Sequence, residues 1–297
     1  MEILLATDLS ARCDRAFDRA MLLSQQWNAR LTIVTAIEEP LDHVTELVAS
    51  LEDMASLIDQ ERDAVAREIR EEAAGTGIPT EVIVRRGKSA EVLVDAVRAG
   101  AYDLVITGIA RRTGFLRSML GGTAEAVLKQ GTSPVLMVKT RARAEYRVVL
   151  TGVDFSEGSR AALACARALF PELRPIVVHT FRPCYIGIAT GPLEHRSMFE
   201  SARADCEQFI AEVVPDWGEL LCIPQVHDAV DELSRQAGRA ASDLIIVGSN
   251  NRGAVAEFLF GSTGRDLISL APCDLMIVPA SWQAPSGRRP HPLEEQS

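Results

Sequence analysis

The sequence predicts two tandem α/β domains, each built on a parallel sheet with helices on both faces. Two internal matches indicate a duplication: residues 2–27 are similar to residues 147–170, and residues 102–128 are similar to residues 242–268. Within each copy, short apolar segments rich in branched residues alternate with longer amphipathic stretches. Strands that alternate with helices are typical of a parallel sheet, and near-continuous apolar strands fit burial on both faces.

Four landmarks recur in the same order in the two copies. The first apolar segment of each copy ends in Asp-x-Ser, the fourth ends in glycine, and a second glycine follows after a gap of equal length. The matched pairs are Asp8 with Asp154, Ser10 with Ser156, Gly108 with Gly248, and Gly121 with Gly261. The repetition predicts one domain over residues 1–141 and another over residues 142–281. The polar stretch 139–147 is the expected linker, and the proline-rich residues 282–297 are expected to be a disordered tail.

Each copy is expected to contribute five strands. Those of the first copy are predicted at residues 2–7, 30–36, 80–86, 103–108 and 134–139, and those of the second at 146–152, 174–180, 220–227, 243–248 and 274–279. The stretch 47–73 has the pattern of an amphipathic helix. With the strand order 3-2-1-4-5, each copy would be a Rossmann-like doubly wound domain, in which ligands bind at the carboxyl ends of the first and fourth strands.

The composition is that of a folded soluble protein. Of the 297 residues, 47% are hydrophobic and 24% are charged, with a formal net charge of -10. This acidic balance argues against nucleic acid or an anionic membrane as a partner. No segment has the pattern of a signal peptide or a membrane span, so a cytoplasmic location is expected. The six cysteines form no C-x-x-C pair and no cluster with histidine, and we expect reduced, mostly buried thiols rather than a metal site or a disulfide.

The end of the second copy has the residues that a phosphate site needs. Such a site requires close backbone N–H groups, a helix N-terminus and a hydroxyl group. The segment Gly261-Ser262-Thr263, at the head of an apolar helix, supplies all three. An ordinary helix start with a hydroxyl cap is the alternative. The matching positions of Gly248 and Asp154 in a duplicated fold favour the phosphate site.

These motifs resemble the universal stress protein family along nearly the whole of both copies. In the family's nucleotide-binding pattern, G-x-x-G-x9-G-[S/T], the second copy replaces only the second glycine, by Asn251. The first copy departs twice, with Arg111 for that glycine and Gly122 for the hydroxyl residue, although Thr123 follows. If the glycine serves a positive φ angle, asparagine is the least costly substitute, whereas arginine costs about 1–2 kcal/mol. If it instead admits phosphate to the backbone, any side chain obstructs binding in both copies.

The resemblance implies ATP as the ligand, with Mg²⁺ as an option, and assigns roles to residues. Asp154 and Asp8 would lie on the adenine or ribose side, and Thr180 and Ala36 would line the base pocket. The phosphate group would be held by Gly248, Asn251, Gly261, Ser262 and Thr263, with Gly108, Gly121, Gly122 and Thr123 as weaker counterparts. For each aspartate the alternative is a cap on the following helix. Arg111 and Arg112 either bring positive charge to a triphosphate or form a solvated pair.

No motif of the chain predicts catalysis beyond slow ATP hydrolysis. A Walker lysine loop, a G-x-S-x-G elbow and an H-E-x-x-H pair are all absent from the sequence. We expect His179 to be a packed strand-end residue. The resemblance therefore implies a nucleotide-binding regulator in stress or energy signalling, for which a protein partner in that signalling is an option. The alternative is an interaction module of the same fold that binds no nucleotide. The resemblance also implies that the two copies pair as an intramolecular pseudo-dimer through residues 134–139 and 274–279, which would cover their open sheet edges, and further homodimerisation is left open.

Overall fold

A computed structural model describes residues 1–8, 13–37, 51–109, 122–180, 192–217, 222–225, 228–249 and 262–284. The elements of the first half are β1 (Glu2–Ala6), α1 (Asp14–Trp27), β2 (Arg30–Ile37), α2 (Leu51–Ala73), β3 (Thr80–Arg86), α3 (Ser89–Ala99), β4 (Leu104–Gly108), α4 (Gly122–Leu128) and β5 (Val135–Val138). Those of the second half are β6 (Val149–Val153), α5 (Glu157–Leu169), β7 (Ile176–Thr180), α6 (Pro192–Val213), the 3-10 turn η2 (Pro215–Trp217), β8 (Cys222–Gln225), α7 (Ala229–Arg239), β9 (Leu244–Ser249), α9 (Ser262–Leu270) and β10 (Asp274–Pro279).

The strands form one ten-stranded sheet in the order β3-β2-β1-β4-β5-β10-β9-β6-β7-β8. Each half contributes five parallel strands in the order 3-2-1-4-5, so the predicted tandem α/β fold is confirmed. The halves meet where β5 and β10 pair antiparallel, with Leu136 opposite Met276. These are the strands through which the sequence predicts an intramolecular pseudo-dimer.

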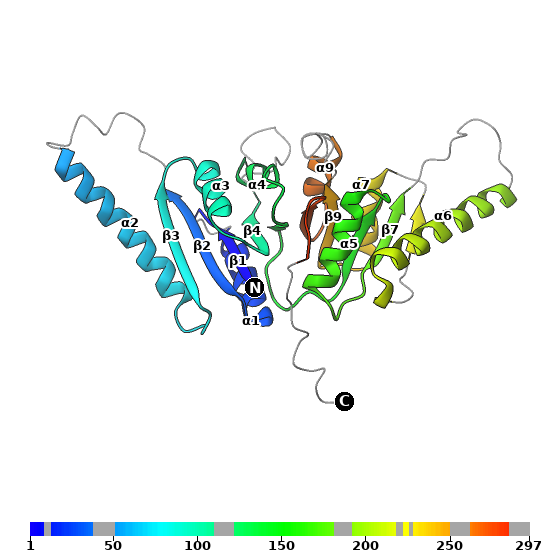
Figure 1. The fold of residues 1–297 in the computed structure, drawn as a ribbon, viewed down its shortest axis with the longest axis horizontal. Coiled ribbons are helices and arrows are strands. Elements are labelled where there is room, and N and C mark those ends of the chain that lie inside the picture. The colour runs from blue at the N-terminus through cyan, green and yellow to red at the C-terminus, as the bar shows by residue number, and fades with distance from the viewer. Residues whose placement is uncertain are drawn as a thin grey trace.

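Helices cover both faces of the sheet (Figure 1). The core beneath α1, α2, α5 and α6 includes Leu23, Ile69, Leu163 and Phe209, and it forms one continuous cluster across the two halves. The core beneath α3, α4, α7 and α9 forms the other cluster. Both faces of the strands are therefore buried, which explains why the strands are apolar along almost their whole length.

Strand β6 begins at Val149, three residues later than predicted. The backbone N–H groups of Arg147 and Val148 donate to Oδ2 of Asp243 at 2.9 Å each, instead of to a neighbouring strand. The first half repeats this arrangement, because the N–H of Glu2 donates to Oδ2 of Asp103 at 2.9 Å. In each half, the aspartate directly before the fourth strand therefore accepts backbone hydrogen bonds at the start of the first strand.

The linker between the halves is anchored on the buried carboxylate of Asp274, the first residue of β10. Oδ1 of Asp274 accepts hydrogen bonds from the backbone N–H groups of Lys139 (2.8 Å) and Thr140 (2.9 Å) and from the Thr140 hydroxyl (2.9 Å). Oδ2 accepts from the Tyr146 hydroxyl at 2.7 Å, and Nε of the buried Arg19 lies 3.6 Å away. The match that pairs Gly121 with Gly261 pairs Asp274 with Pro134, so only the second half carries this anchor.

Aromatic and cationic side chains complete the contact between α1, the linker and α5. The guanidinium of Arg19 lies 3.9 Å from the ring centroid of Tyr146 and donates to the carbonyl oxygen of Ala144 at 2.9 Å. Phe170 packs edge-on against both Trp27 and Tyr146, at 5.5 Å and 5.8 Å. The polar linker is therefore part of the core between the halves rather than a free connection.

The structure contradicts the expectation that all cysteines are reduced thiols. Cys206 of α6 and Cys222 of β8 form a disulfide. Among the remaining cysteines of the described ranges, Cys13, Cys165 and Cys273 are not disulfide-bonded. The pairing depends on the packing of α6 against β8, which sequence spacing alone does not reveal.

Candidate nucleotide site

A cavity of about 90 Å³ lies in the second half, where the order of the strands reverses. Asp154 follows β6, Thr180 ends β7 and Gly248 lies near the end of β9, and all three line the cavity. Helices α7 and α9 close it with apolar side chains, among them Leu233 and Leu267. The structure therefore brings together three of the residues predicted to bind nucleotide in this half.

The carboxylate of Asp154 is fixed by the start of α5. Its Oδ1 atom accepts hydrogen bonds from the Ser156 hydroxyl (2.5 Å), the Ser156 N–H (3.1 Å) and the Ser159 hydroxyl (2.5 Å). Ser159 in turn accepts from the N–H of Asp154 at 2.9 Å, and Ser156 caps α5 by accepting from the N–H of Ser159 at 3.3 Å. Ser156 is therefore the N-cap of α5, and Asp154 supports it through Oδ1, the atom that accepts all three of these hydrogen bonds.

These hydrogen bonds also control the charge of Asp154. Partial burial raises the pKa of the carboxyl group, but the hydrogen bonds from Ser156 and Ser159 outweigh burial, so the pKa lies below its usual value. Asp154 is therefore ionised at neutral pH. A fixed, ionised carboxylate beside the cavity can accept hydrogen bonds from a ligand but repels an anionic group.

Gly248 has a structural reason to be glycine. A Cβ atom at this position would lie 1.9 Å from the carbonyl oxygen of Gly158, in the first turn of α5. The absence of a side chain lets the first turn of α5 approach β9, and Ser159 is the next residue of that turn. Gly248 thus helps to place Ser159 beside Asp154, whether or not a phosphate group also contacts it.

Helix α9 presents the remaining predicted residues. Ser262 and Thr263 are its first two residues, and their side chains lie outside the described part of the structure. Asn251 and Gly261 also lie outside the described residues. Since Leu267 of the same helix lines the cavity, α9 connects the cavity to the helix N-terminus predicted to hold phosphate.

The first half repeats the strand positions but differs at the aspartate. Ala36 lies in β2 and Gly108 ends β4, while Asp8 follows β1 at an exposed position. The match that pairs Asp8 with Asp154 places Cys13 where the second half has Ser159. Burial raises the pKa of the Cys13 thiol, and a hydrogen bond with Asp8 raises it further. A thiol is a weaker donor than a hydroxyl, so Cys13 holds Asp8 less firmly than Ser159 holds Asp154.

The predicted phosphate residues of the first half are described only in part. Gly122 and Thr123 begin α4, and their side chains lie outside the description. Gly121, Arg111 and Arg112 are outside the described residues altogether. Their predicted roles remain predictions.

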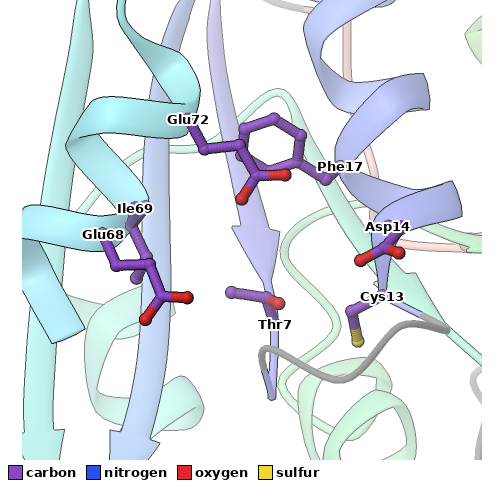
Figure 2. Close-up of a pocket in the computed structure, with 7 residues that line it drawn as sticks. All are labelled: Thr7, Cys13, Asp14, Phe17, Glu68, Ile69 and Glu72. Atoms are coloured by element: carbon purple, nitrogen blue, oxygen red, sulfur yellow. The ribbon is translucent and has the colours of Figure 1, made fainter.

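A second cavity, of about 360 Å³, lies in the first half between α1 and α2. Figure 2 shows the carboxylates of Asp14, Glu68 and Glu72 on its walls, together with Thr7 and Cys13. Partial burial raises the pKa of Glu72, and the neighbouring acidic residues Asp14, Asp18 and Glu68 raise it further. Acidic walls of this kind disfavour a phosphate group. The cavity also lies away from α4, where the phosphate residues of the first half are predicted, because α1 and α2 cover the opposite face of the sheet from α3 and α4.

The model of the universal stress protein family matches the chain twice, over residues 1–139 and over residues 145–279. The chain belongs to the universal stress protein family. A curated universal stress protein of Mycolicibacterium smegmatis is 26% identical over 294 residues, which cover 93% of this chain and 96% of that relative. A universal stress protein of Thermus aquaticus is 32% identical over 138 residues, 45% of this chain and 98% of its own length.

Solved universal stress proteins share the tandem fold. The structure of one from Archaeoglobus fulgidus has a TM-score of 0.61 and 19% sequence identity, and the match covers 93% of this chain and 95% of that one. A structure from Pseudomonas aeruginosa UCBPP-PA14, described as a putative universal stress protein, has a TM-score of 0.62, 17% identity and coverage of 93% and 92%. At these identities the likeness concerns the fold.

Several site residues of this universal stress protein were not predicted from its sequence. Gly158 and Ser159 lie inside the matched stretch 147–170, and comparing the two copies five residues beyond the aspartate, where Ser159 corresponds to Cys13, could have singled them out. Gly152 faces Leu233, whose methyl groups would lie 3.1 Å from a Cβ atom at residue 152. No sequence motif reveals this contact, because it depends on the packing of α7 over β6.

Metal-binding clusters and membrane-spanning helices are both absent from the described residues of this universal stress protein. Within them, His, Cys, Asp and Glu side chains gather nowhere in groups of three suited to a metal ion. In the same residues no helix has both the length and the apolar character needed to cross a bilayer. His179 is a packed strand-end residue, as predicted: it is buried, its Nδ1 lies 3.0 Å from the carbonyl oxygen of Val153, and its ring stacks on Phe155 at 4.3 Å.

Proposed function

We propose that this universal stress protein binds an adenine nucleotide, ATP in the first place, in its second half, and acts as a cytoplasmic regulator in stress or energy signalling. The observation that carries the proposal is the convergence of Asp154, Thr180 and Gly248 on one cavity beside α9. Three strands supply these residues, and each lies near the carboxyl end of its strand. Doubly wound sheets bind ligands at this place.

The cavity suits the base and sugar of a nucleotide. Val178, Val230, Leu233 and Leu267 give it apolar walls, against which a flat base can pack. Oδ1 of Asp154 carries the hydrogen bonds from Ser156 and Ser159, which leaves Oδ2 as an acceptor for a ribose hydroxyl. Thr180, at the end of the neighbouring strand β7, also lines the cavity and adds a hydroxyl group.

The size of the cavity assigns it to one end of the ligand. Whole ligand pockets measure about 300–1,000 Å³, whereas this cavity measures about 90 Å³. It therefore accounts for the base end, and the phosphates would extend to the N-terminus of α9, at Ser262 and Thr263. Mg²⁺ would arrive bound to the phosphates of ATP.

Titration calorimetry with ATP and AMP, with and without Mg²⁺, tests the proposal. Asp154→Asn removes the charge that faces the ribose, and we expect affinity to fall by about tenfold, the equivalent of about 1.4 kcal/mol. Asp8→Asn is the matched control in the first half and should leave the affinity of the second half unchanged. Thermal unfolding of each variant checks that the fold is retained.

The outcome separates the proposal from its alternative. If wild-type protein binds neither nucleotide, the nucleotide proposal is wrong and an interaction module of the same fold remains. If Asp8→Asn lowers the affinity and Asp154→Asn does not, the site lies in the first half. Mass spectrometry of protein purified without added nucleotide gives an independent answer, because a tightly bound nucleotide would be recovered from it.

A further inference from the structure

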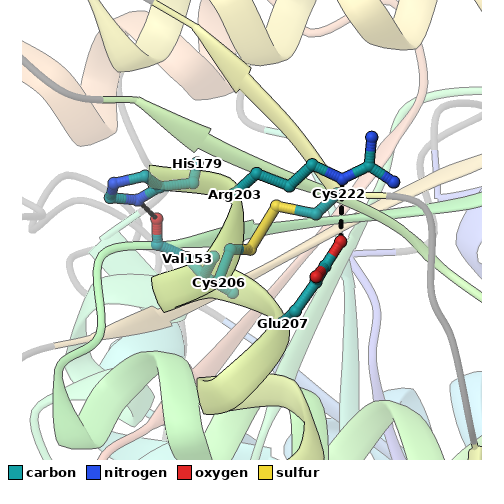
Figure 3. The surroundings of a disulfide bond; sticks show 6 residues. All are labelled: Val153, His179, Arg203, Cys206, Glu207 and Cys222. Carbon is teal, nitrogen blue, oxygen red and sulfur yellow. Dashed lines mark hydrogen bonds and ion pairs between the residues drawn. A yellow bond between two sulfur atoms is a disulfide. The ribbon is translucent and has the colours of Figure 1, made fainter. Parts of the chain in front are cut away.

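The disulfide of the second half fastens an edge strand to the helix that covers it. Cys206 lies in α6 and Cys222 begins β8, at a sequence separation of 16. Within the described part of the chain, strand β8 ends the sheet and pairs with β7 alone. Cys206 is 0% exposed and Cys222 is 5% exposed, so the bond lies inside the layer between helix and sheet (Figure 3).

The first half shows that the fold does not need cysteine at these positions. The match that pairs Gly121 with Gly261 places Ala66 of α2 at the position of Cys206 and Val82 of β3 at that of Cys222. The strand register agrees, because Val82 pairs with Ile33 and Cys222 pairs with Val177, which are matched residues of the two second strands. Two apolar residues in one half thus correspond to a sulfur pair in the other, so the cysteines are not needed to fill these positions in the fold.

The same helix also contacts the residue that follows Asp154. Phe209 lies three residues after Cys206, so the two share the buried face of α6. Its ring meets Phe155 edge-on at 5.4 Å, and Phe155 stacks on His179 at 4.3 Å. Phe155 has a φ angle of +64°, which is strained for a residue with a side chain. The position of α6 therefore supports an unusual backbone conformation directly beside Asp154.

We propose that Cys206 and Cys222 are a reversible redox pair, a dithiol under reducing conditions and a disulfide after oxidation by a hydroperoxide. Closing the bond fixes α6 over β8 and, through Phe209 and Phe155, tightens the turn at Asp154. Disulfides that form in a reducing compartment are usually transient and redox-sensing. This fits a bond at two positions where the first half has the apolar residues Ala66 and Val82 instead. This inference concerns oxidation and does not depend on nucleotide binding.

The chemistry balances with the hydroperoxide as the oxidant. The thiolate of one cysteine attacks the peroxide, an S–O bond forms, the O–O bond breaks, and the alcohol or water leaves, giving a sulfenic acid. The second thiolate attacks this sulfur, the S–S bond forms and water leaves. The two thiols lose two electrons in all and the peroxide gains them. Both sulfurs are buried, so the reaction requires α6 and β8 to separate, and β8 has only one neighbouring strand to hold it.

Alkylation of the full-length protein tests the redox pair. The protein is reduced with a phosphine, freed of reductant, treated with hydrogen peroxide, denatured and alkylated, and its peptides are identified by mass spectrometry. We expect Cys206 and Cys222 to be alkylated before peroxide, linked to each other after it, and alkylated again after renewed reduction. If both remain alkylated after peroxide, or if the bond resists reduction in the folded protein, the redox pair is refuted.

A double variant tests the structural effect. Cys206→Ala with Cys222→Val restores the residues of the first half and cannot form the bond. We expect the oxidised wild type to melt roughly 5–10 °C above its reduced form, and hydrogen exchange in residues 154–160 to slow by at least threefold on oxidation. The double variant should show neither change. Two results would overturn the proposed coupling. One is a redox-dependent change in melting temperature or hydrogen exchange that persists in the double variant. The other is a hydrogen-exchange rate at residues 154–160 that stays the same when the wild type is oxidised.

Discussion

The hydroxyl of Tyr146 lies 2.7 Å from Oδ2 of Asp274, and both side chains are buried between the two halves of the chain. Tyr146 belongs to the linker and Asp274 to the central strand β10. Burial, followed by the charge of Asp274, raises the pKa of Tyr146 well above its usual value, so the phenol remains a donor at neutral pH. The orientation of the halves therefore depends on a polar contact as well as on the pairing of β5 with β10.

Asp274→Ala should be among the most destabilising substitutions in the chain. It removes the acceptor of the Lys139 and Thr140 N–H groups and leaves the buried Arg19 without its counterion. Breaking one partner of a buried ion pair costs about 3–5 kcal/mol. Urea unfolding measures the loss, with Asp18→Ala as control, because the pair of Asp18 with Arg141 is exposed and worth about 1 kcal/mol or less. Equal losses in the two variants would contradict the role given to Asp274.

Tyr146→Phe isolates the hydroxyl group within that cluster. The ring contacts with Phe170 and Arg19 remain, and only the hydrogen bond to Asp274 is lost. We expect a loss of about 1.5–3 kcal/mol in the free energy of unfolding, because the acceptor is charged. Tyr102→Phe is the control, since the Tyr102 hydroxyl makes no hydrogen bond within the described residues, and its loss of stability should be smaller. A cost below that of the control would show that water replaces the hydroxyl at Asp274.

Ser159→Ala should change how stability depends on pH. The pKa of Asp154 is lower in the folded protein than the ordinary 3.8, so its contribution is complete above that value and is lost as pH falls through the folded pKa. Without the Ser159 hydroxyl this pKa rises, and the variant should be less stable than wild type at pH 7 by about 1 kcal/mol. The difference should shrink near pH 3. Urea unfolding at both pH values and carboxyl NMR titration of Asp154 check this, and Ser159→Cys, the residue of the first half, should lie between the two.

Two glycine substitutions should have opposite effects. In Gly248→Ala the new Cβ atom would lie 1.9 Å from the carbonyl oxygen of Gly158, so the first turn of α5 must move. Overpacking of this kind costs about 1–3 kcal/mol or more. Gly238→Ala places its Cβ in open space within α7 and should stabilise the protein by about 0.5–1 kcal/mol, since alanine favours a helix. Thermal unfolding compares them, and equal effects would contradict the close approach of α5 to β9.

Much of the fold could be predicted from the sequence because it repeats. The strand at residues 80–86 was predicted to the residue, and the pairing of the last strands of the two halves was predicted from the family resemblance together with their apolar edges. In the candidate site, Asp154, Thr180 and Gly248 converge because strand ends in a doubly wound sheet meet at one edge. Periodicity and topology were sufficient for these features.

The remaining features depend on contacts between distant elements. Asp274 has the sequence context of a strand start, and only the fold brings Tyr146 and Arg19 to it. Cys206 and Cys222 show no spacing motif, because their bond arises from helix packing over an edge strand. Gly248 was assigned to phosphate, whereas the structure shows that it also admits the first turn of α5.

The antiparallel junction of β5 and β10 joins two halves that belong to the same chain. In a dimer of identical subunits, every substitution occurs twice, and an interface residue must suit its own copy. Here Asp274 has no counterpart in the other half, because the matched position holds Pro134. Covalent linkage also keeps the halves together at any dilution. Each half is thereby free to diverge, so one can specialise in recognition while the other is retained as a permanently attached partner.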